Sequence, residues 1–300
     1  MDTVVPGINI KKKPNTPPYI YSDGTTILGA DDKAGLAAIL ETIHSIKEHQ
    51  LSHGQIQFVI TAGEESGLLG IKATDTNLLD ADFGYAVDAS KDVGTTVIGA
   101  PTQVKIYTTI KGKTAYASTP SKGISAINIA SKVISRMNLG QVDALTTANI
   151  GKFHVGSATN IVADEVVLEA EARSHNEESI ERQVQHMKDT FEMTASEYGG
   201  EAQVVIEKSY QGFKVNENDK VTQIAKASAL ALGLKGDTCI AGGGSDGSIM
   251  NQYGIPSVVL GVGYENIHTT SERVSTKDLY MLANHCLLYT SDAADERSSV

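Results

Sequence analysis

Four acidic side chains and one histidine in this sequence could together bind a metal ion. They are Asp31, Glu64, Glu65, Asp88 and His268. Carboxylate oxygens and an imidazole nitrogen suit zinc, manganese or a similar cation. One carboxylate can also bridge two ions ~3.5–4 Å apart, as in sites where two metals hold a reacting water. Because the side chains of adjacent glutamates diverge, one can bind metal while the other acts as a general base.

Taken singly, a pair of acidic residues or a lone histidine is more typical of a solvated surface than of a site. The positions of these residues are more informative. The apolar run QIQFVITA predicts a strand that ends on Gly63, Glu64 and Glu65, and the run Tyr85–Val87 predicts one that ends on Asp88. Further along, DTCIA ends on the glycine-rich GGGSDG, and IPSVVLGVG precedes Tyr264–His268.

Helical periodicity follows Asp31, and it completes an α/β pattern. One face of this helix would carry Leu36, Ile39, Leu40, Ile43 and Ile46. Strands that alternate with helices indicate a mainly parallel α/β sheet, in which ligands bind outside the carboxyl ends of the strands. Because Glu64, Glu65 and Asp88 lie at such ends, the sequence predicts a site there.

The middle of the chain follows a different pattern. TQVKIYTTIKG predicts a strand, Ser121–Met137 a helix, SATNIVADE with VVLEAEARS a strand pair, Glu177–Tyr198 a helix and AQVVIEKS a strand. This βαββαβ order suggests a ferredoxin-like sandwich. We therefore expect residues 1–98 and 212–300 to form a discontinuous catalytic domain, and residues 99–211 to form an inserted α+β lid that also serves dimerisation.

Composition excludes several classes of function. The net charge of −11 and the scattered lysines and arginines argue against a nucleic-acid partner. No apolar run approaches the ~20 residues that span a bilayer, so we expect no membrane partner. Two cysteines, Cys239 and Cys286, and the absence of a signal-peptide pattern favour a cytoplasmic protein with reduced thiols. The glycine run at Gly242–Gly244 lacks the GxGxxG and Gly-Lys-Ser/Thr patterns of nucleotide loops.

Five ordered motifs resemble a known family. They are GADDKAG at Gly29–Gly35, TAGEESGLLG at Thr61–Gly70, VDAS at Val87–Ser90, GGGSDG at Gly242–Gly247 and GYENIHTTSE at Gly263–Glu272. The chain is similar to the di-zinc exopeptidase family of peptidase T, carboxypeptidase G and succinyl-diaminopimelate desuccinylase, and most similar to its peptidase T-like branch. The resemblance extends to about Leu288.

The resemblance implies a role for each residue of the site. Asp31 would bridge two zinc ions, Glu65 and His268 would complete one site, and Asp88 would serve the other. Glu64 would take a proton from the bridging water and pass it to the leaving amine. Substrate contacts would come from the residues that match the lid and the glycine loop: Asn160, Arg173, Tyr116 and Gly243.

Three departures from the family pattern bear on activity. The family's His-x-Asp motif would begin one residue before Met1, so Asp2 matches its Asp, which orients the imidazole. We expect the preceding N-terminal segment to be missing, which leaves one tight zinc site and a crippled enzyme. Tyr116 stands where the family usually has a histidine near the substrate carbonyl. The tail after Leu288, YTSDAADERSSV, shows no apolar periodicity and predicts no continuing helix.

The sequence therefore predicts a zinc hydrolase that cleaves a short peptide from its N-terminus and forms a homodimer through the lid. Two other functions remain open. One is an amidohydrolase that removes an acyl group from an amino acid. The other is a non-catalytic binding or dimerisation module that retains the fold.

Overall fold

The computed structural model describes residues 10–12, 18–156 and 158–297. Asp2 lies outside these residues. The chain divides into two compact units: Met1–Ala100 with Phe213–Val300, and Pro101–Gly212. The prediction from sequence placed this division after residues 98 and 211. Each unit has its own hydrophobic core.

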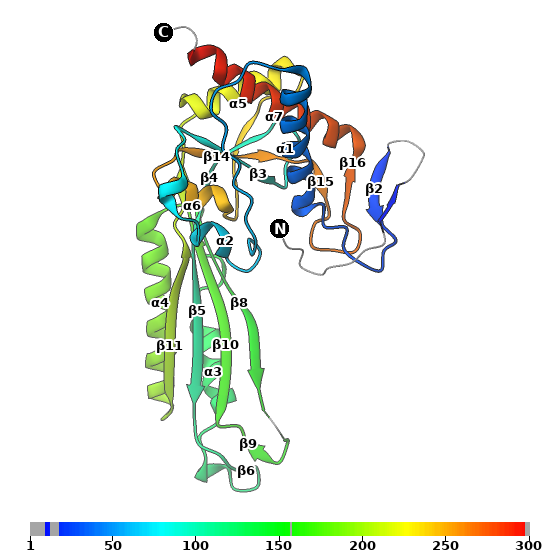
Figure 1. Ribbon diagram of the computed structural model, residues 1–300. Coiled ribbons are helices and arrows are strands. Elements are labelled where there is room, and N and C mark those ends of the chain that lie inside the picture. Colours follow the sequence, from blue (N-terminus) through cyan, green and yellow to red (C-terminus); the bar gives the residue numbers. More distant parts are fainter. Residues whose placement is uncertain (1–9, 13–17, 157, 298–300) are drawn as a thin grey trace. The chain divides into compact units, whose positions relative to one another are not determined.

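The first unit is built on a mixed five-stranded sheet (Figure 1). Its order is β12 (Phe213–Lys214), β4 (Thr96–Ala100), β14 (Ser257–Gly261) and β3 (Gly84–Ala89), and β13 (Thr238–Ile240) also pairs with β4. β14 is parallel to β3 but antiparallel to β4. The longer pairings, β14 with β3 and β13 with β4, are parallel as predicted, but β4 is antiparallel to β14 and β12, so the sheet is mixed. The six residues that join β3 to β4 are too few for the crossover that parallel strands require.

Helices cover both faces of this sheet. α1 (Ala30–His49), α5 (Lys220–Ala231) and α7 (Thr276–Arg297) lie on one face, and α6 (Asp246–Gln252) lies on the other (Figure 1). The face of α1 that packs carries small side chains, among them Ala34 and Ala38, rather than the predicted Leu40, which is 51% exposed. Small residues allow α1 to approach the strands closely: a Cβ on Gly35 would lie only 2.3 Å from the Val87 carbonyl oxygen.

The predicted strand at residues 55–62 is absent from the structure. Side chains hold this segment instead: Gln57 donates to the Leu78 carbonyl, and Gln55 donates to the Asp80 carbonyl. Within the described part of the chain, no strand lies beside it to complete a ladder. The sequence of residues 55–62 has the pattern of a strand, but a strand is stable only beside a neighbouring strand that forms backbone hydrogen bonds with it. The short helices α2 (Leu69–Lys72) and η1 (Thr76–Leu78) follow.

A separate antiparallel sheet supports the His268 loop. Its order is β1 (Ile10–Lys12), β2 (Tyr19–Ser22), β16 (Arg273–Ser275) and β15 (Tyr264–Glu265). Tyr264 faces Val274 across the β15–β16 ladder. The intervening residues 266–272 therefore form a loop whose two ends are fixed by this ladder.

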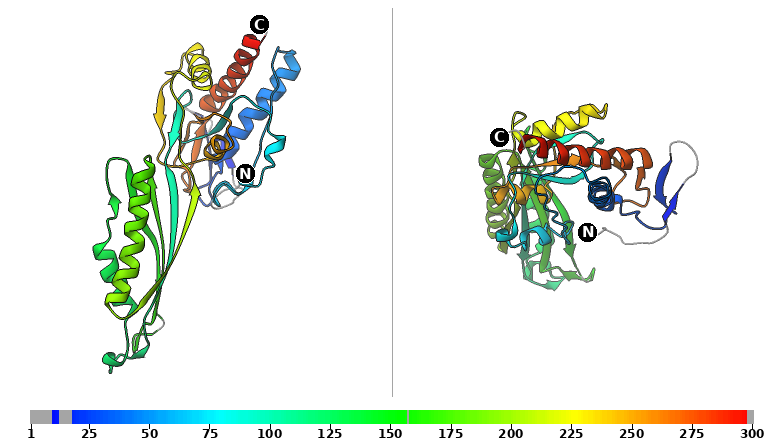
Figure 2. Two further views of the ribbon diagram at one scale, coloured as in Figure 1. Left: turned by 90° about the vertical axis from the view of Figure 1, so that its left-hand side faces the viewer. Right: turned by 45° about the horizontal axis from the view of Figure 1, so that its top comes forward.

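The second unit is an antiparallel sheet with two helices on one face (Figure 2). β5 (Thr102–Lys111), α3 (Ala126–Arg136), β8 (Thr146–Val155), β10 (Glu165–Ser174), α4 (Glu177–Glu197) and β11 (Glu201–Tyr210) give the βαββαβ order. In space the order is β11-β5-β10-β8, with β7 (Gly140–Gln141) at the end. β10 lies between β5 and β8 and pairs with both. It does not pair with the SATNIVADE segment, whose short β9 (Ile161–Val162) pairs with β6 (Ala115–Tyr116).

The chain ends differently from the sequence-based expectation. α7 continues beyond Leu288 to Arg297. Packing supports its middle, because the ring of Tyr289 lies 4.2 Å from that of Tyr85 on β3, measured between centroids. None of the helices in the described ranges combines the length and the apolar character needed to cross a membrane.

Candidate metal centre

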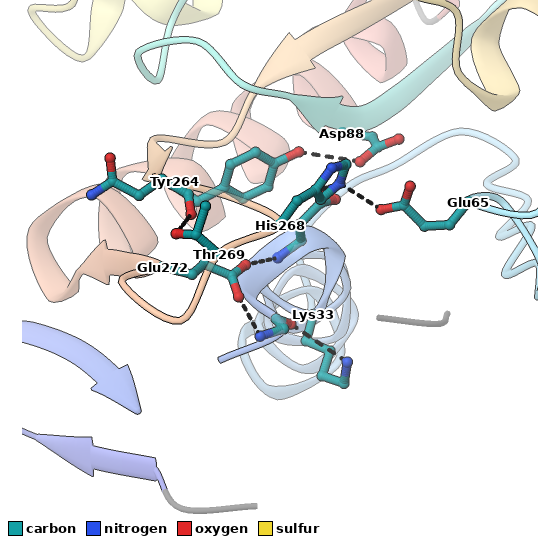
Figure 3. A network of polar contacts seen from close by, with 10 residues as sticks. Lys33, Glu65, Asp88, Tyr264, His268, Thr269 and Glu272 are labelled. Carbon is teal, nitrogen blue, oxygen red and sulfur yellow. Dashed lines mark hydrogen bonds and ion pairs between the residues drawn. The ribbon is translucent and has the colours of Figure 1, made fainter. Parts of the chain in front are cut away.

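Three of the predicted ligands converge in the first unit (Figure 3). His268 Nε2 lies 2.8 Å from Glu65 Oε1 and 3.1 Å from Asp31 Oδ2. Ligands of one tetrahedral zinc ion lie roughly 3.4 Å apart, so the three donors need little movement to share a cation. Asp31 is the most buried of the three and His268 the most exposed. The cluster is therefore open to solvent on the His268 side.

Glu272 positions Asp31 through the backbone. Its side chain is buried, and its two carboxylate oxygens accept hydrogen bonds from the Gly29 N–H at 2.5 Å and the Asp31 N–H at 2.9 Å (Figure 3). Gly29 has a φ of 73°, a left-handed conformation that favours glycine. The start of α1 is thereby tied to the loop that carries His268.

A turn after residue 62 places the two glutamates. The Glu64 carbonyl accepts hydrogen bonds from the N–H groups of Gly67 and Leu68. Just before the turn, Thr61 Oγ1 donates to Asp246 Oδ2 at 2.5 Å. The turn directs Glu65 to His268. Burial raises the pKa of Asp32 and Asp88, and the Glu64 carboxylate is close enough to raise both further by charge repulsion.

Asp88 lies near the end of β3, beside Asp31. The Tyr264 hydroxyl donates a hydrogen bond to Asp88 Oδ1 at 3.2 Å (Figure 3). Burial, and then the nearby Asp88 carboxylate, raise the pKa of Tyr264, so this phenol stays a neutral donor. Burial raises the pKa of Asp88, and the nearby Asp31 carboxylate raises it further. The two carboxyl groups are therefore close enough for Asp31 to serve two adjacent ions.

The electrostatics of the cluster favour a cation. Burial raises the pKa of Asp31, and the neighbouring Glu65 carboxylate raises it further. Burial also raises the pKa of Asp32 and Asp88 well above the ordinary value, with smaller contributions from the surrounding carboxylates. A divalent cation would relieve this repulsion, so the donor set fits a bound metal.

The predicted substrate contacts lie in two places. Gly243 is in the loop before α6, in the first unit. The other three belong to the second unit. Tyr116 is 73% exposed, Asn160 is exposed with its carbonyl accepting the Ala117 N–H, and Arg173 donates from Nε to Glu171 Oε1 at 2.8 Å. The Glu171–Arg173 ion pair is half-buried. None of these contacts tests a role in substrate binding, so the substrate roles stay predictions.

Sequence reasoning missed three residues of the site. Glu272 and Tyr264 orient Asp31 and Asp88, and Asp32 accepts the Gly35 N–H at 2.9 Å. All three stand inside motifs that were recognised, GADDKAG and GYENIHTTSE. Their proximity to the ligands along the chain was the available signal. The long-range contacts of Glu272 and Tyr264 could not be predicted from one sequence.

An α/β fold that gathers carboxylates and a histidine beside its central sheet is the arrangement of a metal-dependent hydrolase. A family model for Peptidase family M20/M25/M40 matches residues 1–289. The chain therefore belongs to Peptidase family M20/M25/M40, which places it among the metallopeptidases.

Solved structures and a curated relative agree with this placement. The crystal structure of a tripeptidase from Staphylococcus aureus is 67% identical, with a TM-score of 0.94, and the match covers 98% of this chain and 79% of that one. An aminopeptidase PepT from Bacillus cereus is 49% identical, with a TM-score of 0.88 and the same coverage. Peptidase T from Bacillus subtilis is 29% identical to this chain. The match covers 88% of this chain and 65% of the length of that peptidase.

Proposed function

We propose that this protein is a zinc-dependent aminopeptidase or tripeptidase of the peptidase T-like branch, which hydrolyses short peptides. The observation that carries the proposal is the convergence of Asp31, Glu65 and His268, with Glu64 beside them. The tripeptidase and the aminopeptidase PepT that resemble the chain support the choice of substrate class.

Each residue of the cluster has a distinct part in this reaction. Asp31, Glu65 and His268 would hold the metal, which when bound supplies Lewis acidity and makes a water molecule more acidic. Glu64 is next to a ligand without being part of the three-donor cluster, so its carboxylate accepts a proton from the attacking water. The protonated Glu64 then returns the proton to the nitrogen of the leaving amine. A general base of this kind contributes ~10²–10⁴-fold to the rate.

The proposed sites for two ions are unequal in this chain. Asp31, Glu65 and His268 give one ion three protein ligands, which is the usual set for a catalytic zinc. Among the residues that the structure describes, the other ion would have Asp31 and Asp88, both carboxylates. We therefore expect one tightly bound zinc and a second that binds weakly, with correspondingly low turnover.

The second unit, Pro101–Gly212, is proposed to act as the lid and to carry the homodimer contact. Asn160, Arg173 and Tyr116 would bind substrate from it, with Gly243 contributing from the glycine loop. Support for the dimer comes from β11, an edge strand of ten residues that exposes Val205 by 62% and Ile206 by 41%. A long edge with exposed apolar side chains is suited to pairing with a second copy.

The adjacent glutamates provide the experiment that tests the proposed function. Glu64→Gln should retain zinc but lose at least ~10²-fold in turnover of a tripeptide. Glu65→Gln should lose zinc itself, because a neutral amide is a poor ligand. Zinc content and hydrolysis of a panel of di- and tripeptides and N-acyl amino acids would be measured for both variants. Faster hydrolysis of the N-acyl amino acids would replace peptidase by amidohydrolase, and zinc loss in Glu64→Gln alone would reverse the two roles.

A further inference from the structure

The turn that carries Glu64 and Glu65 is closed by its own backbone. The N–H groups of Gly67 and Leu68 donate to the Glu64 carbonyl, and the chain then continues directly into α2. Among the described residues, no strand pairs with residues 55–62 just before the turn. The local hydrogen bonds fix the shape of the turn, so contacts with other elements must fix its place beside the sheet.

The short helix α6 contacts this segment at two points. At the start of the helix, the Asp246 carboxylate accepts a hydrogen bond from the Thr61 hydroxyl at 2.5 Å. At its end, the Tyr253 hydroxyl donates to the carbonyl of Ile71, a buried residue of α2, at 3.0 Å. α2 packs beside α6 (Figure 1). The turn with Glu64 and Glu65 therefore lies between two anchors on one helix.

α6 is itself fixed to the central sheet. A Cβ on Gly247 would lie 3.0 Å from a methyl group of Val259 on β14 and 3.4 Å from the Cβ of Ala86 on β3, so the helix lies close against both strands. The Asn251 side chain donates to the Ser257 carbonyl and accepts from the Ser257 N–H, which joins the helix to the start of β14. β3 also carries one of the proposed metal ligands. α6 therefore connects that strand to the turn that carries another ligand.

The Asp246 anchor is the stronger of the two and the nearer to Glu64. It pairs a hydroxyl with a carboxylate, and such charge-assisted hydrogen bonds are short and roughly twice as strong as neutral ones. The place of Asp246 in the first turn of α6 also favours its negative charge. Thr61 stands three residues before Glu64, whereas the Ile71 anchor lies seven residues after it. A shift at Thr61 is therefore passed to the Glu64 carboxylate over a shorter stretch of backbone.

We propose that Asp246 is a positioning residue for the hydrolytic reaction, which acts by holding Thr61 and thereby the Glu64 carboxylate. This inference rests on the proposed function, in which Glu64 takes a proton from the attacking water. A general base must lie within hydrogen-bonding distance of that water, about 2.6–3.2 Å, and an error of ~1 Å can cost ~10²-fold in rate. Loss of the Asp246 anchor should therefore lower kcat without weakening substrate binding.

Kinetics with a tripeptide at saturating zinc test this role in the reaction. Asp246→Ala should lower kcat by at least ~10-fold and change KM by less than ~2-fold. Asp246→Asn keeps an acceptor for Thr61 but loses the charge, so its kcat should lie between those of the alanine variant and the unchanged protein. Tyr253→Phe is the matched control, because it removes the anchor at the other end of α6, and its kcat should stay within ~2-fold.

Further variants show whether the effect passes through Thr61 and Glu64. Thr61→Val removes only the hydroxyl and should reproduce the loss in kcat, even where Asp246→Ala folds poorly, whereas Thr61→Ser should keep the kcat of the unchanged protein. Adding Thr61→Val to Asp246→Ala should cost less than a further ~2-fold. In a Glu64→Gln background, Asp246→Ala should also cost less than ~2-fold, because the group that it positions is already inactive. A full ~10-fold loss in that background would overturn the proposal.

Hydrogen exchange in the metal-free protein tests the anchor without any hydrolysis. In Asp246→Ala, exchange at Gly67 and Leu68 should accelerate at least ~5-fold more than at the buried amides of β14, which report opening of the whole unit. Equal acceleration in both places, or an unchanged kcat, would overturn the proposal and leave Asp246 as a stabiliser of α6 alone. Faster exchange at the turn in a protein that hydrolyses no peptide would instead overturn the proposed function, and with it the role in the reaction, while the anchor itself would stand.

Discussion

Replacing Glu272 by glutamine exchanges one of the two carboxylate oxygens that hold the backbone at Asp31 for an NH₂ group. The carboxylate of Glu272 is 1% exposed and accepts from Gly29 and Asp31, one N–H to each oxygen. Glutamine keeps one acceptor and turns an NH₂ group towards the other N–H. A hydrogen bond to a charged group contributes ~1.5–3 kcal/mol, and a buried donor left without a partner costs ~1–3 kcal/mol. The two contributions together predict that Glu272→Gln lowers the free energy of unfolding by about 2.5–6 kcal/mol.

The same change should weaken zinc binding. Residues that orient metal ligands typically contribute ~10–100-fold to metal affinity, and Glu272 holds the backbone of Asp31. Calorimetric titration with zinc and urea unfolding in a chelator would measure the two effects separately. Glu265→Gln is the control: Glu265 lies in the same motif, but its ion pair with Arg273 is at the surface and contributes at most ~1 kcal/mol. Unchanged zinc affinity in Glu272→Gln, with stability reduced, would refute the role in positioning Asp31.

Three further outcomes are expected. Burial raises the pKa of Asp32 and Asp88 above the ~3.9 of an unfolded chain, so the stability of the metal-free protein should fall as the pH rises above about 4 and these groups ionise. Since zinc binds the ionised forms, zinc should raise Tm more at pH 7 than at pH 5, and the reverse order in thermal melts would contradict this. Tyr264→Phe removes the hydrogen bond to Asp88 and should lower the free energy of unfolding, measured with urea at pH 7, by ~1.5–3 kcal/mol. A loss below ~0.5 kcal/mol would mean that this hydrogen bond contributes little. Tyr116→His should raise turnover of a tripeptide by up to ~10-fold below pH 7, where the imidazole is partly charged. Superimposable pH–rate profiles of this variant and the unchanged protein would place position 116 away from the substrate.

The sequence was most informative where function constrains it. Asp31, Glu65 and His268 stand far apart in the chain, yet their motifs predicted the cluster that the structure forms. The βαββαβ order of the second unit was also readable, because its strands and helices have clear periodicity. Asp2 lies outside the described residues, so its orienting role stays a prediction.

The errors have physical causes. A strand at residues 55–62 was predicted from local pattern, but strand formation depends on a neighbour that the pattern does not contain. The direction of β4 depends on the length of one connection, which periodicity does not report. Glu272 looked like a polar loop residue, and only the fold brings it to the N–H groups of Gly29 and Asp31. Long-range pairing of this kind is the information that a single sequence withholds.

The most direct test of the metal centre is a crystal structure of the zinc-loaded protein, with anomalous diffraction recorded at the zinc absorption edge. The strongest anomalous peak should lie within ~2.0–2.2 Å of Asp31, Glu65 and His268 Nε2. A weaker peak, if the second ion is present, should lie between Asp31 and Asp88. A peak of full occupancy elsewhere, or no peak at these three ligands, would contradict the proposed metal centre.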